Sequence, residues 1–248
     1  MEYGYEPVDL KIRRIPYYAI SFIRVLIAIR REKRLEFITG VVFNKQKSIY
    51  LKKMDLFFHI KTLLDILTLK EVVLDKEYER GGVRIEKKDK VIVDIGAGFG
   101  DFSIFAAKKN PDAKIYAFEP DRTYIPLLKE NIKKNRVGNV RVNSEAVFSM
   151  EQIFRFIRPQ SNRSKYGPNH FTQCDFMKID CEGCEFQILS KESLKFLGSV
   201  KKISMEYHEN DRFKVRTLVD LLRKEGRQVS FYPRRNSEGL GLLVSKAY

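Results

Sequence analysis

The feature that most constrains this chain is the alternation of strand-like and helix-like segments after residue 90. Short apolar runs typical of buried strands occur at 91–95, 114–119, 140–147, 176–180, 202–208, 228–233 and 241–248. Between them lie helix-period segments that begin at Phe102, span 123–135, begin near Phe186 and span 215–226. Such alternation predicts an α/β fold with a mostly parallel sheet and helices on both faces. The last two strands are expected to close the sheet as an antiparallel hairpin.

The first 80 residues follow a different pattern. Apolar residues recur at helix spacing in two groups: Phe22, Ile23, Leu26 and Ile27, and then Phe57, Ile60, Leu63, Leu64 and Leu67. We therefore expect a helical N-terminal extension over residues 1–50 and a Rossmann-like domain over 51–248. The chain of 248 residues is 44% hydrophobic, with 18 Phe and 12 Tyr, so it can bury a sizeable core. This composition excludes intrinsic disorder.

Positive charge is concentrated in the N-terminal extension. The formal net charge is +15, and twelve Lys and Arg between Lys11 and Lys53 face only two acids, Glu32 and Glu36. Arg155, Arg158, Arg163 and Lys165 form a smaller basic run. A basic arm beside a domain whose positive and negative charges nearly balance indicates an anionic partner: RNA, an acidic lipid surface or a phosphorylated substrate. A solvated basic face explains the same pattern equally well.

No segment predicts a membrane span. The best candidate, Pro16 to Ile29, is apolar over fourteen residues but is interrupted by Arg24, whereas a spanning helix needs roughly 20 apolar residues. A core or interfacial helix is the better interpretation, which leaves contact with a membrane surface open. Three cysteines are too few for a disulfide framework, so we expect a reducing, cytoplasmic location.

The cysteines also raise the question of a zinc or redox site. Cys181 and Cys184 are spaced as C-x-x-C, and Cys174 lies nearby. A structural zinc site needs four ligands, and a second pair is missing unless His170 joins. We therefore predict no metal site and place the pair, partly buried, in a strand-to-helix turn.

A glycine-rich turn follows the first predicted strand of the domain. It reads Asp94-Ile-Gly96-Ala97-Gly98-Phe-Gly100. Glycines let the backbone approach a ligand closely, and the helix that follows presents free N–H groups. The dinucleotide fingerprint is excluded because Asp101 stands where G-x-G-x-x-G requires its third glycine. An acid at the strand end suits a cationic ligand better than a pyrophosphate, and S-adenosylmethionine carries both an ammonium and a sulfonium.

Two further strand ends carry carboxylates at suitable positions. Glu119 lies 23 residues after Gly96, where a carboxylate can accept hydrogen bonds from both ribose hydroxyls. Glu145 ends the third strand and is expected to accept a bond from the adenine amino group. The backbone of Ala146 would contact the edge of the same ring.

The fourth strand ends in the segment Lys178-Ile-Asp180-Cys-Glu182-Gly-Cys-Glu185. Three carboxylates and a lysine are costly to bury together unless they bind something. Candidates for a general base at or just past strand ends are Asp180, Glu182, Glu206 and His208. A histidine has a suitable pKa for that task, although a lone histidine is more often structural.

This segment resembles the hallmark of the FkbM-type methyltransferases, Lys-Ile-Asp-x-Glu-Gly-x-Glu. The resemblance covers roughly residues 50 to 248 and includes VDIGAGFGDFS, FEPD and LLKENIKKN, whereas the cysteine pair departs from the commoner pattern. It implies a class I methyltransferase Rossmann-like fold with seven strands, S-adenosylmethionine as cofactor, and methyl transfer usually to oxygen. Carried over, the family roles place the methionine end on Asp94, Gly96, Gly98 and Gly100, the ribose on Glu119, the adenine on Glu145, and the reactive centre at Asp180.

The expected function is therefore S-adenosylmethionine-dependent methylation of a hydroxyl on a small molecule, lipid or carbohydrate. Two alternatives stay open. One is an RNA methyltransferase that uses the basic arm and the 155–165 run. The other is a membrane-surface or scaffold protein that keeps a relic cofactor fold.

Overall fold

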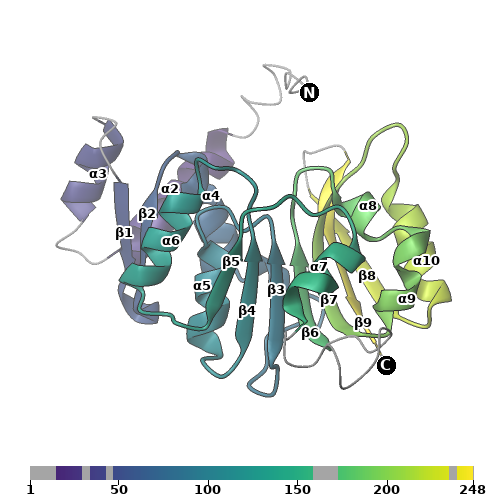
Figure 1. Cartoon of the computed structure of the whole chain (residues 1–248). Coiled ribbons are helices and arrows are strands. Elements are labelled where there is room, and N and C mark those ends of the chain that lie inside the picture. Colours follow the sequence, from purple (N-terminus) through teal and green to yellow (C-terminus); the bar gives the residue numbers. More distant parts are fainter. Residues whose placement is uncertain (1–14, 30–33, 43–46, 159–172, 235–238, 248) are drawn as a thin grey trace.

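The computed structural model describes residues 15–29, 34–42, 47–158, 173–234 and 239–247, and every structural statement below refers to them. Its centre is a seven-stranded sheet in the order β5-β4-β3-β6-β7-β9-β8 (Figure 1). The strands are β3 (Val91–Ile95), β4 (Lys114–Phe118), β5 (Val140–Asn143), β6 (Cys174–Ile179), β7 (Val200–His208), β8 (Gln228–Pro233) and β9 (Leu240–Lys246). Neighbours from β5 to β7 pair in parallel, and β9 pairs antiparallel with both β7 and β8. The predicted mostly parallel sheet with a closing hairpin is confirmed.

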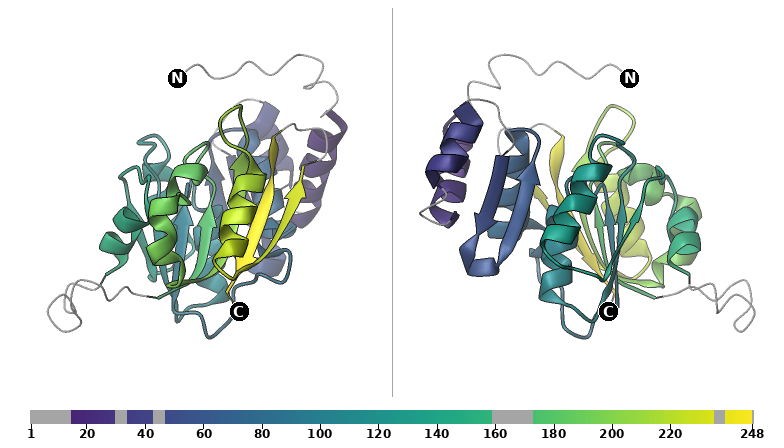
Figure 2. Two further views of the ribbon diagram at one scale, coloured as in Figure 1. Left: turned by 90° about the vertical axis from the view of Figure 1, so that its right-hand side faces the viewer. Right: turned by 60° about the vertical axis from the view of Figure 1, so that its left-hand side comes forward.

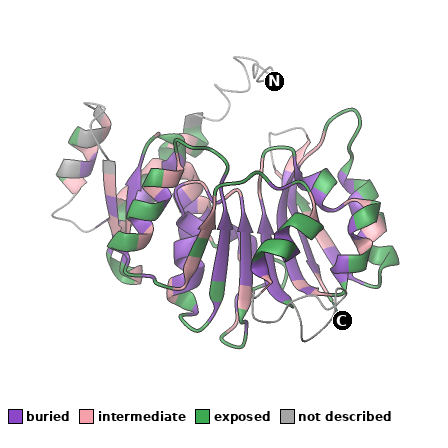
Figure 3. Cartoon of the chain, in the orientation of Figure 1, coloured by how far each residue is buried: buried purple, intermediate pink, exposed green. Residues whose placement is uncertain are grey.

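Helices cover both faces of this sheet, as predicted. One face carries α5 (Asp101–Lys109) and α6 (Ile125–Lys134); the other carries α7 (Met150–Ile157), α8 (Glu185–Ile188), α9 (Leu194–Leu197) and α10 (Val215–Lys224). Successive strand residues face opposite sides, so Ile92 packs with the α5 side while Val93 packs with the α7 side. Figure 3 shows the central strands as mostly buried, whereas the edge strands β5 and β8 are mostly intermediate or exposed. The sheet thus has an apolar core on each face.

One strand is shorter than expected, and one helix was not predicted. The predicted strand 140–147 ends at Asn143, because the Asn143 Oδ1 accepts a hydrogen bond from the N–H of Glu145 (2.8 Å) and turns the chain. Helix α7 then begins after Ser149, which forms a capping box with Gln152. The sequence carried this signal, a Ser followed three residues later by Gln before an apolar run.

The N-terminal part combines helices with a hairpin. It contains α2 (Ile15–Ala28), α3 (Arg34–Val42), β1 (Lys47–Leu51), β2 (Leu56–Ile60), α4 (Leu64–Leu69) and the short helical turns η2 (Lys52–Met54), η3 (Lys70–Leu74) and η4 (Glu77–Glu79). The expectation that the apolar residues from Phe57 to Leu67 form one helix is wrong, since residues 56–60 are strand β2. Asp55 adopts a left-handed conformation (φ 51°), which reverses the chain and pairs β2 with β1.

The free edge of β2 is held by asparagines of α6. The Oδ1 of Asn131 accepts the N–H of His59 (2.7 Å), and the Oδ1 of Asn135 accepts that of Phe57 (2.8 Å). These side chains substitute for a neighbouring strand. Figure 2 shows the β1–β2 hairpin beside α6, outside the seven-stranded sheet.

The N-terminal elements pack on the sheet domain. Val25, Ile29 and Phe37 belong to the same core cluster as Phe102, and the expected boundary at residue 50 lies inside β1. The division into extension and domain stays a prediction. Helix α2 exposes three apolar side chains at helix spacing, Ile20, Ile23 and Ile27. Within the described ranges, no helix is long and apolar enough to cross a membrane.

Candidate functional site

The predicted ligand-binding residues lie at the carboxyl ends of four neighbouring strands, β5, β4, β3 and β6. Carboxyl ends of parallel strands meet at one edge of a sheet, where ligands of open α/β folds bind. The sheet order therefore brings segments from residues 94 to 185 into one row. Two cavities lie along this edge.

The glycine turn after β3 has the geometry that its sequence predicted. Gly96, Gly98 and Gly100 have φ values of 74°, 51° and 93°, a region that favours glycine. A Cβ on Gly96 would lie 1.7 Å from the backbone oxygen of Asp180, whereas one on Gly98 would meet nothing within 4 Å. The turn is thus pressed against the end of β6 at Gly96 and leaves space for a ligand at Gly98. Ala97 is buried, and its N–H donates to Phe118 O (3.0 Å).

Asp94 lies beneath the turn instead of on its open side. Its side chain is completely buried, accepts a hydrogen bond from Ser103 Oγ (2.6 Å) and lies 3.1 Å from Lys178 Nζ. Lys178 in turn donates to the backbone oxygen of Gly96 (2.6 Å). Burial alone would lower the pKa of Lys178, but Asp94 and Asp180 raise it, so the lysine is charged. Asp94 thus supports the turn through Lys178, and the contact with the methionine end expected for Asp94 stays a prediction.

Glu119 follows β4 and connects to the glycine turn. Its Oε2 accepts the N–H of Gly98 (2.6 Å), and its Oε1 accepts that of Asp121 (2.8 Å). Burial raises its pKa against the lowering effect of these two hydrogen bonds. Each carboxylate oxygen has a second lone pair, so the predicted bonds to ribose hydroxyls are compatible with this arrangement.

Glu145 and Ala146 line a cavity of about 270 Å³ beyond the end of β5. The other lining residues are Asn143, Val147, Gln152, Arg155 and Phe156. An aromatic side chain and polar groups suit a flat heteroaromatic ring such as adenine. The Glu145 cavity, Glu119 and the glycine turn follow three neighbouring strands, β5, β4 and β3, and the part of S-adenosylmethionine that each would hold stays a prediction.

A second cavity of about 250 Å³ lies at the other end of the row, and we call it the Asp180 pocket. Its lining residues are Thr68, Glu71, Val72, Glu77, Tyr78, Asp180, Glu182, Glu206, His208, Arg234 and Leu240. All four predicted base candidates are among them. The remaining wall comes from the N-terminal segment 68–78 and from the start of the loop after β8.

Asp180 is held by a residue that the sequence did not reveal. Its Oδ2 accepts a hydrogen bond from Tyr78 Oη (2.7 Å) and lies 3.6 Å from Lys178 Nζ. Burial, followed by the charge of Asp180, raises the pKa of Tyr78, so the hydroxyl keeps its proton and donates. Tyr78 precedes Asp180 by 102 residues, and no local motif marks it.

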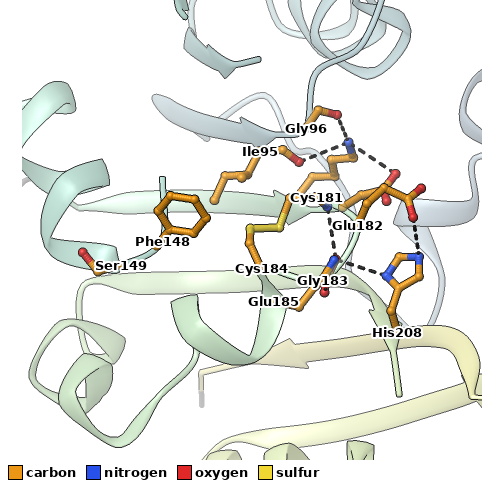
Figure 4. Close-up of a disulfide and its surroundings, with 12 residues drawn as sticks. Ile95, Gly96, Phe148, Ser149, Cys181, Glu182, Gly183, Cys184, Glu185 and His208 are labelled. Carbon is orange, nitrogen blue, oxygen red and sulfur yellow. Dashed lines mark hydrogen bonds and ion pairs between the residues drawn. A yellow bond between two sulfur atoms is a disulfide. The ribbon is translucent and has the colours of Figure 1, made fainter. Parts of the chain in front are cut away.

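His208 lies between two carboxylates (Figure 4). Its Nδ1 is 3.1 Å from Glu185 Oε1, and its Nε2 is 3.2 Å from Glu182 Oε2. Burial by itself would lower the pKa of His208, but hydrogen bonds to Glu182 and Glu185 raise it to about 10. In this arrangement the ring is protonated at neutral pH, which disfavours the general-base role expected for it.

Glu206 is the most buried of the base candidates, and Arg234 accompanies it. Arg234 Nη1 lies 2.9 Å from Glu206 Oε1, and its Nη2 contacts Glu71 (3.1 Å) and Glu77 (3.3 Å). Burial, followed by the negative charge of Asp180, raises the pKa of Glu206 to about 8. One arginine thus contacts three carboxylates, and no sequence motif indicated this arrangement.

The cysteine pair forms a disulfide between Cys181 and Cys184 (Figure 4). The turn between them is tight, with Glu182 at φ 54° and Gly183 at φ 110°. The expected strand-to-helix turn is confirmed, and Cys184 is buried in it. The disulfide itself was not expected from a chain with three cysteines. Cys174 is a free, buried thiol, and His170 lies outside the described residues.

Comparisons with known proteins find similarity to methyltransferases. Residues 66–155 match the model of the TRM5/TYW2 methyltransferase domain. The 31-O-demethyl-FK506 methyltransferase FkbM of Streptomyces tacrolimicus is 36% identical over 78 residues, which are 32% of this chain and 29% of that protein. The antimetabolite synthetase AmbE of Pseudomonas aeruginosa is 40% identical over 50 residues, 20% of this chain and 2% of its own length. The chain thus spans less than a third of either curated relative.

Solved structures show the same architecture. An rRNA methylase from Streptococcus thermophilus superimposes with a TM-score of 0.51 at 11% identity, covering 71% of this chain and 95% of that one. At this identity the likeness concerns the fold alone. The sheet order and this superposition show a class I, Rossmann-like methyltransferase fold, and residues 66–155 are similar to a methyltransferase domain.

Proposed function

We propose that the protein transfers a methyl group from S-adenosylmethionine to a hydroxyl of a small molecule, lipid or carbohydrate. The observation that carries this proposal is the position of Asp180. Its backbone oxygen lies against Gly96 of the cofactor turn, while its side chain lines the Asp180 pocket. A group bound in that pocket would therefore lie beside the methionine end of the cofactor.

The cofactor supplies a methyl group that is already activated by its attachment to a sulfonium. The chain's own task is to align the acceptor and to accept its proton. The glycine turn leaves space at Gly98 for the methionine end, Glu119 would hold the ribose, and the Glu145 cavity would hold the adenine. This assignment follows the row of strand ends described above.

We propose that a carboxylate of the Asp180 pocket accepts the proton from the acceptor hydroxyl. Asp180 and Glu206 are the candidates, because both line the pocket and each is oriented by a neighbour, Tyr78 or Arg234. Glu182 and His208 lie at the same pocket and would orient the acceptor. A polar pocket of this size suits a hydroxyl-bearing group better than an apolar one.

Oxygen as the acceptor atom is supported by two findings. The chain resembles the FkbM-type methyltransferases through Lys178 to Glu185, and the FkbM relative is named for methylation at a 31-O position. RNA is the alternative acceptor, in keeping with the basic arm. The TRM5/TYW2 match ends at residue 155, so it contains β3, β4 and β5, whose ends we assign to the cofactor, but not β6 or β7. It therefore does not favour RNA over a smaller acceptor.

The test is methyl transfer from S-adenosylmethionine with a labelled methyl group. Purified protein is incubated with three acceptor classes: hydroxyl-bearing polyketides, sugars or lipid alcohols, and RNA. We expect labelling of a hydroxyl compound, its loss in Asp180→Asn, and its persistence in Glu225→Gln, a change at an exposed glutamate that is not among the pocket-lining residues. Labelling of RNA alone would overturn the proposed acceptor class.

A further inference from the structure

The wall of the Asp180 pocket holds more carboxylates than cationic groups. Five acids line it: Glu71, Glu77, Asp180, Glu182 and Glu206. Arg234 and His208 are the cationic groups in the same lining. Lys178 Nζ lies 3.1 Å from the buried Asp94 and 3.6 Å from Asp180, so its charge is shared between these two acids. With Glu206 counted as neutral, because its pKa is raised to about 8, the lining still holds four acids against Arg234 and His208. Such an excess of acids in a partly enclosed site favours a bound cation.

Three of these side chains converge on one point. Ligand atoms of Asp180, Glu182 and His208 all lie within 4.8 Å of one another, so a single ion can contact all three. Asp180 and Glu182 follow β6, and His208 ends the neighbouring strand β7. The parallel pairing of β6 with β7 therefore brings the three together. Glu182 is 85% exposed, so its side chain is free to adjust to an ion.

The orientation of His208 is independent support for a metal. Metal-binding histidines usually donate their second ring N–H to a carboxylate, which fixes the tautomer and the ring. Here Nδ1 lies 3.1 Å from Glu185 Oε1, and Glu185 is fully buried. Glu185 is itself fixed by the N–H groups of Cys181 (3.2 Å) and Gly183 (3.0 Å). The ring thus directs Nε2 towards Glu182 Oε2, which lies 3.2 Å away (Figure 4).

We propose that Asp180, Glu182 and His208 bind a divalent metal ion, with Glu185 as the positioning residue for His208. The ion would take the place of the proton on His208 Nε2, which is released to solvent on binding. One imidazole and two carboxylates favour a first-row ion such as Mn²⁺ over Ca²⁺ or Mg²⁺, which prefer oxygen ligands alone. Three protein ligands leave coordination positions open towards the pocket. On the proposed function, one of these positions takes the acceptor oxygen and holds it beside the cofactor turn. The sequence did not predict this site, because its ligands lie in two segments on separate strands.

The experiment is a titration of the purified full chain with Mn²⁺, followed by the loss of the electron paramagnetic resonance signal of the free ion. It is run without cofactor, acceptor or thiol reductant, so it is independent of methyl transfer. We expect one Mn²⁺ per chain, and displacement by Zn²⁺ at lower concentrations than by Mg²⁺. His208→Ala and Asp180→Asn should abolish this binding, whereas Glu225→Gln, the control, should retain it.

Glu185→Gln tests the positioning role while keeping an acceptor for the backbone N–H groups. We expect Mn²⁺ affinity to fall by roughly 10-fold to 100-fold in this variant. Circular dichroism confirms that each variant is folded. Absence of stoichiometric Mn²⁺ binding by folded wild type would overturn the proposal. Equal affinity of wild type and His208→Ala would also overturn it. S-adenosylmethionine binding, measured separately, tests the proposed function alone.

Discussion

The glycine turn offers a matched pair of substitutions, Gly96→Ala and Gly98→Ala. Both residues have positive φ, 74° and 51°, so alanine at either position carries a left-handed backbone cost of about 1–2 kcal/mol. Only Gly96 is also in close contact. Its added Cβ would lie 1.7 Å from the backbone oxygen of Asp180, which cannot rotate away.

The close contact at Gly96 determines how much more stability Gly96→Ala should lose than Gly98→Ala. Forcing an extra methyl group into a packed site costs about 1–3 kcal/mol. We therefore expect Gly98→Ala to lower the free energy of unfolding by about 1–2 kcal/mol, and Gly96→Ala to lower it by about 2–5 kcal/mol. Urea-induced unfolding of the three proteins, followed by circular dichroism, measures both values.

The two variants should also separate folding from ligand binding. The space above Gly98 is open, and we assign it to the methionine end of the cofactor, so Gly98→Ala should bind S-adenosylmethionine more weakly while staying folded. Equal losses of stability in the two variants would refute the packing of the turn on β6. Unchanged cofactor affinity in Gly98→Ala would refute the placement of the ligand.

Three further predictions concern other parts of the molecule. Asn131→Ala removes three hydrogen bonds that the Asn131 side chain makes with the backbone of His59 and Phe99. Thermal unfolding should therefore show a free energy of unfolding lower by about 2–4 kcal/mol, and the exposed Lys133→Ala serves as control. Thiol titration of the unreduced, denatured chain should find one free thiol, Cys174; three would contradict the disulfide. Burial raises the pKa of Asp101 to about 7, so its ionisation destabilises the fold as pH rises towards 7. At pH 8, Asp101→Asn should therefore unfold at a higher urea concentration than wild type, whereas at pH 4 the two proteins should unfold at nearly the same concentration. An equal difference between their midpoints at the two pH values would contradict this.

The sheet was predictable because its signals are local. The run from Val91 to Ile95 is apolar and short, and the glycine turn follows it directly. Residues that bind at strand ends are therefore adjacent to recognisable strands, which is why Glu119 and Asp180 could be placed. The hairpin β1–β2 was missed because Phe57 and Ile60 also fit a helical period, and β2 is held by asparagines of the distant helix α6.

Only part of the Asp180 pocket could be predicted, because only part of its lining lies next to a recognisable strand. Its β6 and β7 residues follow strands, but Tyr78 and Arg234 reach it from segments without a motif. Their roles depend on tertiary packing: Tyr78 is buried against Asp180, and Arg234 is surrounded by carboxylates. The disulfide was missed because C-x-x-C spacing is equally compatible with free thiols, a metal site or a bridge.

The central claim is that the row from the Glu145 cavity to Gly98 binds S-adenosylmethionine. Calorimetric titration of the cofactor into wild type and Glu119→Ala tests it most directly. We predict micromolar binding by wild type and a loss of ~1–3 kcal/mol in the variant, because Glu119 is a buried acceptor that also fixes the Gly98 N–H. Absence of binding by a well-folded wild type, or equal binding by both proteins, would contradict the account.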